Sequence, residues 1–186
     1  TNTDEDQTKS HKENTMNTII AEAETTYNYD PRARKWIVAN GAEIARFPAG
    51  NLGKHRAQLY ALNQDRPDLA GLIHKIVGRN YDHKAIGMAL KAAQILIDEL
   101  LYSNGFVQSQ SRPGILHQVT WSGIPKTYGC TCEAMQFCAI SVDGVGWLCK
   151  HSLADHFADL LKIELPRQPI PFNGEPAVYD NDFIDF

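Results

Sequence analysis

The chain has 186 residues, of which 43% are hydrophobic and 22% charged, and its formal net charge is −4. This length and composition suit one ordinary globular domain, with or without a small appendage, and exclude a disulfide-rich scaffold. No apolar run approaches the roughly 20 residues needed to cross a bilayer, and the first thirty residues are polar and acidic, unlike a cleavable signal peptide. We therefore expect an intracellular protein that does not enter a membrane.

The charge is distributed unevenly along the chain. Residues 32–91 carry eleven Lys or Arg against four Asp or Glu, whereas residues 1–31 and residues 152–186 each carry two against seven. A basic middle between two acidic ends is more informative than the total. Residues 1–26 are also poor in large apolar groups, and we predict that they are disordered because they cannot bury enough surface to offset chain entropy.

Residues 35–47 predict a β-hairpin. Asn40-Gly41 lies between two apolar stretches, and this dipeptide is the strongest short-range hairpin signal because a type I′ turn needs positive φ at both central residues. With these two residues as the turn, Ile37 faces Ile44 on the partner strand.

Three helices are expected after the hairpin. The third is apolar nearly all round, which is typical of a central core helix. A loop at residues 109–114 follows, so residues 27–108 are predicted to form one basic region of hairpin and helices. The expected bounds are about Lys54 to Asn63, Leu69 to about Val77, and about His83 to Tyr102 with a stop at Asn104-Gly105.

Residues 109–165 are predicted to form a small module of short strands and one helix. Ser152-Leu153-Ala154-Asp155 has the form of a capping box, and the helix after it should run from Leu153 to Lys162. Residues 166–186 are expected to form a Pro-rich acidic tail. The expected strands cover about residues 115–121, 126–128, 136–142 and 146–148.

Two short pairs of metal-binding residue types lie in this module. Cys130-Thr131-Cys132 is followed, after sixteen residues, by Cys149-Lys150-His151. Three thiols and an imidazole suit one tetrahedral metal ion, and zinc is the ion that best matches this donor set. Two disulfides, or four unrelated core cysteines, are the alternatives that the residues leave open.

The other cysteine and histidines near this module, and the lysine between two of the ligands, are expected to have other roles. Cys138 is expected in the middle of a strand as a buried small apolar residue, and Lys150 would offset part of the negative charge of the thiolates. His117 and His156 are further imidazoles, and we expect His156 to be exposed or packed rather than bound to metal.

The order C-x-C, a variable gap, C-x-H and then an amphipathic helix resembles the SWIM-type zinc finger over about residues 115–163. The resemblance implies a ββα module with one structural zinc ion held by Cys130, Cys132, Cys149 and His151, with no open position for a catalytic water. It also implies binding to DNA or protein partners, because such modules occur in transposase-like proteins, helicase-associated proteins and recombination accessory factors.

The basic middle also contains aromatic residues between its cations, at Trp36, Phe47, Tyr60 and Tyr81. A basic face with aromatic platforms suits a nucleic-acid backbone with stacked bases, whereas the alternative is a solvated surface over core aromatics. The candidates that cluster best flank one turn region: Arg32, Arg34, Lys35, Arg46, Lys54 and Arg56.

The last nine residues, 178–186, are acidic and aromatic. They look like the tails with which bacterial single-stranded DNA-binding proteins dock their partners, except that Asp185 stands where those tails usually have proline. The alternatives are packing on the chain's own domain and shielding of the basic middle. The predicted partner-binding residues are Asp182, Phe183, Asp185 and Phe186.

No catalytic motif accompanies these features: the chain has no Gly-rich phosphate loop, nucleophile elbow or His-Glu-x-x-His. We predict an α+β fold, a β-hairpin plus helices followed by a small zinc-stabilised ββα module. The predicted function is that of a zinc-binding, nucleic-acid-binding accessory protein, with DNA as the expected partner, in replication, recombination or a mobile element. The alternatives are a protein-interaction adaptor that uses the zinc module and the tail, and an enzyme with an unrecognised site in the helical region.

Overall fold

A computed structural model describes residues 25–77, 82–123 and 126–166. The fold is mixed α+β, as the sequence predicted. Most of the predicted N-terminal disorder and almost all of the predicted acidic tail lie outside the described residues. In chain order the elements are β1 (Thr26–Asp30), β2 (Lys35–Asn40), β3 (Ala42–Pro48), α1 (Asn51–Asp65), α2 (Pro67–Val77), α3 (His83–Ile97), β4 (Phe106–Gln108), β5 (Leu116–Gly123), β6 (Lys126–Cys130), α4 (Glu133–Phe137), β7 (Ile140–Val142), β8 (Gly146–Leu148) and α5 (Lys150–Leu161).

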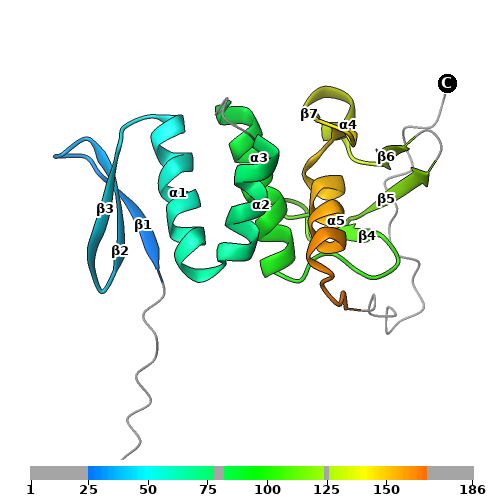
Figure 1. Cartoon of the computed structure of the whole chain (residues 1–186), viewed down its shortest axis with the longest axis horizontal. Coiled ribbons are helices and arrows are strands. Elements are labelled where there is room, and N and C mark those ends of the chain that lie inside the picture. The colour runs from blue at the N-terminus through cyan, green and yellow to red at the C-terminus, as the bar shows by residue number, and fades with distance from the viewer. Residues whose placement is uncertain (1–24, 78–81, 124–125, 167–186) are drawn as a thin grey trace, which may run out of the picture.

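The molecule is elongated, and its parts follow one another along the long axis (Figure 1). A three-stranded antiparallel sheet, in the order β1-β2-β3, lies at one end, and helix α1 covers one of its faces. Helix α1 can approach β3 closely because Gly53 has no side chain: a Cβ there would lie 1.7 Å from the carbonyl oxygen of Pro48. The apolar contacts between sheet and helix join Trp36, Val38, Ala45 and Phe47 to Ala57 and Ala61.

Strand β1 is an element that the sequence did not predict, so the hairpin is in fact part of a three-stranded meander. The turn from β1 to β2 is held by Asp30, whose Oδ1 accepts hydrogen bonds from the backbone N–H groups of Arg32 at 2.8 Å and Ala33 at 3.1 Å. This turn carries several of the basic residues of the middle segment.

The predicted hairpin register was wrong. Val38 pairs with Ala45 and Ile37 with Arg46, because a β-bulge between Val38 and Ala39 shifts the pairing. Asn40 pairs with Ala42 and Ala39 with Glu43, so without the bulge Ile44 would lie opposite Val38, on the face that α1 covers. The bulge puts the smaller Ala45 there instead, where it packs with Val38 and Ala57.

Helices α1, α2 and α3 occupy the middle of the molecule, where the sequence predicted them. Helix α2 starts with Pro67, a residue suited to the first helical position, and the Asp82 side chain caps α3 by accepting from the Lys84 backbone N–H at 3.1 Å. The end of α3 was predicted five residues too late. It stops at Ile97, and Glu99 then takes a positive φ of 53°.

The early end of α3 allows the next segment to enter the second half of the fold. Leu101 forms an isolated β-bridge with Val107 of β4, and both side chains are buried. Strands β4, β5 and β6 form the second sheet, and β7 pairs with β8 in a third. Helix α5 packs against α3 and carries the largest fully buried side chain, Phe157.

One hydrophobic core joins the helical middle to the second half. It contains residues of α1, α2, α3 and α5 together with residues of strands β4 to β8, among them Ile73, Ile95, Val107, Leu148 and Phe157. The small sheets therefore do not hang from the helices as an isolated appendage. None of the helices in the described part of the chain is both long and apolar enough to cross a membrane.

Candidate metal centre

The four predicted ligands come together from two hairpins and two helix starts. Cys130 is the last residue of β6, and Cys132 is the N-cap of α4. Cys149 follows β8 and is the N-cap of α5, whose second residue is His151. Their three sulfur atoms and one imidazole nitrogen all lie within 4.8 Å of one another.

Their spacing and burial fit a zinc-binding site. Zinc–sulfur and zinc–nitrogen bonds of about 2.3 and 2.0 Å, at a tetrahedral angle, put S and N about 3.5 Å apart. Cys130 Sγ lies 3.7 Å from His151 Nδ1, so Nδ1 is the ring atom that can bind the metal. Cys132 is 6% exposed, Cys149 0% and His151 2%. All four cysteines are free in the structure, and Cys138 lies outside the cluster, so the structure contains neither disulfide of the alternative.

Backbone and side-chain hydrogen bonds of Thr131 hold the first ligand pair against the neighbouring strand. Its backbone N–H donates to the carbonyl of Gln118 at 3.1 Å, and its Oγ1 accepts from the Gln118 N–H at 3.0 Å. Strand β6 is already paired with β5 up to Cys130, opposite Val119. The residue between the two thiols is therefore a structural part of the site.

The second ligand pair is positioned by the start of α5. Cys149 and Ser152 form a capping box, in which the Ser152 Oγ accepts from the Cys149 backbone N–H at 3.0 Å. The same hydroxyl lies 3.4 Å from Cys149 Sγ. The helix was predicted to begin after a cap at Ser152, but Cys149 is the cap. The helix N-terminus thus faces a thiolate, which it stabilises.

The three thiols share their protons. The pKa of Cys149 is lowered because it accepts hydrogen bonds from Cys130 and Cys132, and the pKa of Cys130 is raised because its thiol is hydrogen-bonded to Cys132 and Cys149. Cys132 has its pKa raised to about 11, although its hydrogen bond with Cys130 acts in the opposite direction; the contact with Cys149 and burial prevail. Three neighbouring buried thiolates repel one another, so full deprotonation requires a cation between them.

Lys150 supplies a positive charge beside the ligands. Burial lowers its pKa, whereas the three cysteines act to raise it, and Nζ donates to Gln110 Oε1 at 3.1 Å. Three thiolates with one divalent zinc ion leave a charge of about −1, which a lysine at this position offsets. The predicted role of Lys150 agrees with this placement.

Two histidines flank the cluster in different ways. His117, which is 3% exposed, stacks on His151 with ring centroids 4.6 Å apart and an interplanar angle of 27°. Its ring fixes one face of the ligand imidazole. The His156 Nδ1 lies 3.5 Å from the hydroxyl of Tyr128 and is half-buried, so His156 is packed, as expected, and is not part of the cluster.

The prediction for Cys138 was wrong. Residues 133–137 form helix α4 where the sequence predicted the start of a strand, and Cys138 is the exposed residue that ends this helix. The helix forms because Cys132 caps it and its backbone carbonyl accepts from the Met135 N–H at 3.0 Å. The alternation of apolar residues along this segment gave no sign of a short helix directly after the second ligand, Cys132.

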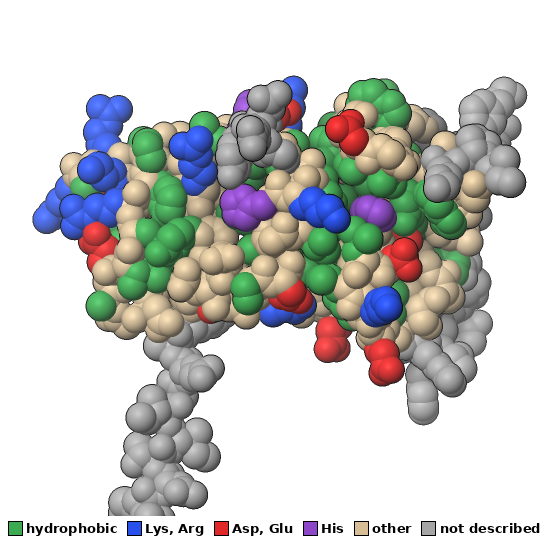
Figure 2. Space-filling model, viewed as in Figure 1, with side chains coloured by type: hydrophobic (Ala, Val, Ile, Leu, Met, Phe, Trp, Pro, Cys, Tyr) green, Lys and Arg blue, Asp and Glu red, His purple; other side chains and the backbone are tan. Residues whose placement is uncertain are grey.

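The predicted nucleic-acid-binding residues fall into three places. Arg32 and Arg34 lie in the β1–β2 turn and Lys35 begins β2, all three exposed, while Arg46 lies on β3 beside Ile37. Because side chains alternate along a strand, Lys35 and Arg46 point away from α1, on the open face of the sheet. Lys and Arg side chains gather at this end of the molecule (Figure 2).

The other two cations lie on α1. Lys54 Nζ is 5.7 Å from the ring centroid of Trp36, a cation–π distance, and therefore borders the sheet. Arg56 instead lines a separate hollow of about 410 Å³ with Phe47, Tyr60 and His74. Five of the six cations are thus near the sheet end, and Arg56 faces elsewhere.

Arg46 is not a free charge. Its guanidinium donates to Glu43 through two nitrogen atoms, and the Nη2–Oε2 distance is 2.9 Å. This contact holds the pKa of the Glu43 carboxyl below its usual value. The predicted partner-binding residues Asp182, Phe183, Asp185 and Phe186 lie outside the described residues.

Comparison of the chain with protein-family models, with curated proteins and with solved structures found no match. The Cys3His cluster therefore fits a zinc site through its own chemistry: donor types, burial and spacing. What the chain binds beyond a metal has to be inferred from its surfaces.

Proposed function

We propose that this chain is a zinc-stabilised, nucleic-acid-binding accessory protein with DNA as its partner. The observation that carries the proposal is the group of exposed cations at the end of the first sheet: Arg32 and Arg34 in the β1–β2 turn, with Lys35 and Arg46 on the face that α1 does not cover. A sheet or ribbon of two or three strands is narrow enough to lie along a DNA groove, and its arginines and lysines can contact phosphates. The accessory role in replication, recombination or a mobile element rests on the resemblance to SWIM-type modules.

In this proposal the zinc ion is structural. Its three thiolates and one imidazole would fill a tetrahedral site and leave no coordination position for a reacting water. These four ligand residues bind the ion, orient α5 and hold the adjoining loops. We assign no catalytic activity to the chain.

Salt dependence of DNA binding tests the proposal. Binding of the zinc-loaded chain to a labelled duplex, measured by fluorescence anisotropy, should weaken steeply between 50 and 200 mM salt, with a log–log slope of about −0.9 per phosphate contact. Lys35→Ala should reduce that slope by about 0.9. Lys75→Ala removes another exposed lysine, from α2 and away from the sheet, and serves as the matched control. Absence of binding at low salt refutes the proposal.

The rival is a protein-interaction adaptor that binds no nucleic acid. The observation in its favour is the pair of exposed aromatic rings on the zinc half, Phe137 at 80% and Trp147 at 63%. The acidic, aromatic segment 178–186 would be a second docking element in this alternative. Retention of a protein partner by a chain that binds neither single- nor double-stranded DNA would favour the adaptor.

A further inference from the structure

A groove between α3 and the zinc half brings together features that are far apart in the sequence. Its volume is about 730 Å³. One wall is formed by the first half of α3 with His55 of α1, and the other by the segment from Phe137 to Ser141 with Trp147. Gly87 allows the His55 ring to pack closely against α3, since a Cβ at position 87 would lie 2.8 Å from the His55 imidazole.

Phe137 and Trp147 are the most exposed large hydrophobic side chains in the described residues, at 80% and 63%. Both are tied to the metal centre. Phe137 ends the helix that Cys132 caps, and Trp147 lies on β8, two residues before Cys149. The two exposed rings therefore lie on segments that the metal ligands hold in place. The geometry of the surface they form depends on the metal.

The opposite wall is positively charged. Lys84 and Lys91, about two turns apart on one side of α3, line the groove with the two imidazoles of His55 and His83. Asp82 is the one acidic residue among the described residues of the lining. Its carboxylate is engaged at the start of α3, where it accepts from the Lys84 N–H at 3.1 Å and lies 3.5 Å from His83 Nδ1.

We propose that this groove binds single-stranded nucleic acid, with bases stacked on Phe137 and Trp147 and the phosphate backbone along Lys84 and Lys91. Aromatic platforms beside lysines suit a single strand because its bases are free to stack on protein rings, whereas the bases of a duplex are already stacked on one another. This inference rests on the proposed nucleic-acid function and adds to it a second surface that prefers a different form of the ligand.

A second aromatic hollow on the same half of the molecule provides an internal comparison. Trp121, which is 50% exposed, packs against Tyr128 with ring centroids 4.6 Å apart and an interplanar angle of 45°, and it lines a hollow of about 740 Å³. The lining of that hollow contains two carboxylates, Asp155 and Asp159, against one lysine, Lys162. Trp121 is therefore an exposed tryptophan that lines a hollow of similar size, but the carboxylates of this hollow repel phosphate. Trp121 is the matched control for Trp147.

The test uses the full zinc-loaded chain and a labelled oligothymidine at low salt. Phe137→Ala and Trp147→Ala should each lower the affinity about 5- to 150-fold, the range expected for the loss of one stacked base. Trp121→Ala should leave the affinity unchanged. Lys84→Ala and Lys91→Ala should each reduce the salt slope by about 0.7, the value for single strands. Both ring positions are exposed, and an unchanged zinc content confirms that the variants fold.

The result separates this inference from the proposed function. If duplex binding persists and depends on Lys35, but Phe137→Ala and Trp147→Ala do not change oligothymidine binding, the groove inference is wrong and the sheet proposal stands. If the chain binds no nucleic acid at low salt, both are wrong. Quenching of Trp147 fluorescence by an acidic, aromatic peptide and not by oligothymidine would identify a protein-docking groove and overturn the inference.

Discussion

Removal of one carboxylate should strengthen the proposed DNA contact of the sheet. Glu43 holds Arg46 in an exposed ion pair, so the proposed phosphate contacts fall to the exposed Arg32, Arg34 and Lys35. Three phosphate contacts predict a log–log salt slope of about −2.7, and the release of Arg46 by Glu43→Gln raises the number to four and the slope to about −3.6. Between 50 and 200 mM salt, the affinity should then fall about 150-fold instead of about 40-fold.

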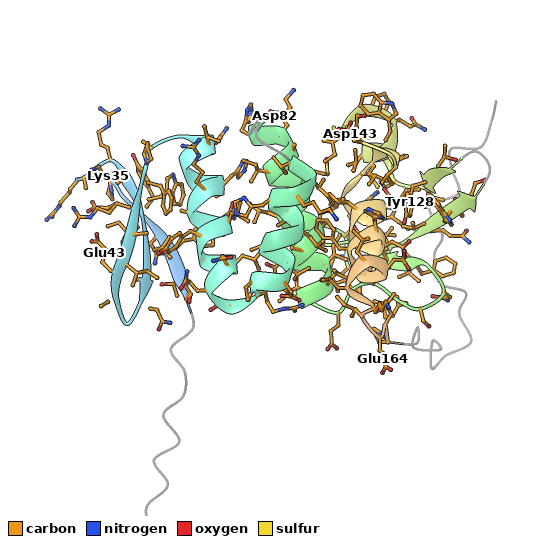
Figure 3. The ribbon with its side chains drawn as sticks, in the orientation of Figure 1. Lys35, Glu43, Asp82, Tyr128, Asp143 and Glu164 are labelled. Carbon is orange, nitrogen blue, oxygen red and sulfur yellow. The ribbon has the colours of Figure 1, made fainter. Side chains whose placement is uncertain are left out.

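Anisotropy titrations of a labelled duplex at four salt concentrations would measure both slopes. Glu164→Gln removes the same charge in the other half of the molecule, far from Glu43 (Figure 3), and controls for the change in net charge. We expect Glu164→Gln to leave the slope unchanged. An equal change of slope in both variants, or no change in either, would refute a specific phosphate contact by the sheet.

Three further outcomes test the metal centre and the core. Cys132→Ser should abolish binding of one zinc ion per chain in metal analysis, whereas Cys138→Ser should retain it, and equal zinc content in both would show that the ligand assignment is wrong. Phe157→Ala should lower the free energy of unfolding by about 3–5 kcal/mol in a single cooperative urea transition, because its ring lies in the shared core; two separate transitions would contradict this. Asp155 has its pKa raised, first by burial and then by Asp159, so the ionised form destabilises the fold at neutral pH. Asp155→Asn should therefore stabilise the chain at pH 7 and not below about pH 3, where the carboxyl is protonated in both folded and unfolded chains, and an equal gain at both values would disprove the cause.

The metal site was predictable because each pair of ligands is nearly adjacent in the sequence. Cys130 with Cys132, and Cys149 with His151, need only a turn and a helix start to converge, and the chemistry of the donor set does the rest. The packing around the site was not predictable in this way. The stacking of His117 on His151 joins β5 to α5 and depends on how the two halves of the fold meet.

Errors in the elements arose where a local signal competed with tertiary packing. The Asn40-Gly41 signal located the turn, but Asn40 pairs with Ala42 around Gly41, and the bulge then places Ala45 instead of Ile44 opposite Val38 under α1, so the register differs from the predicted one. Apolar residues continue past Ile97 as if the helix did, yet Leu101 is used in a β-bridge with Val107. The groove of Phe137 and Trp147 was missed because its cations come from α3, about fifty residues earlier.

Cys149 immediately precedes α5, and this position also affects the order in which the chain folds. Sixteen residues separate the two ligand pairs, so closing this loop costs only about 2.5 kcal/mol beyond a constant. Zinc binding to finger peptides provides about 10–16 kcal/mol, and a helix is slow to start because its first turn must be fixed before it gains hydrogen bonds. A metal ion that gathers the four ligands would fix that first turn of α5 and deliver a preformed helix, with Phe157 on it, to α3. Refolding should therefore be faster with zinc present at the start than with zinc added after collapse.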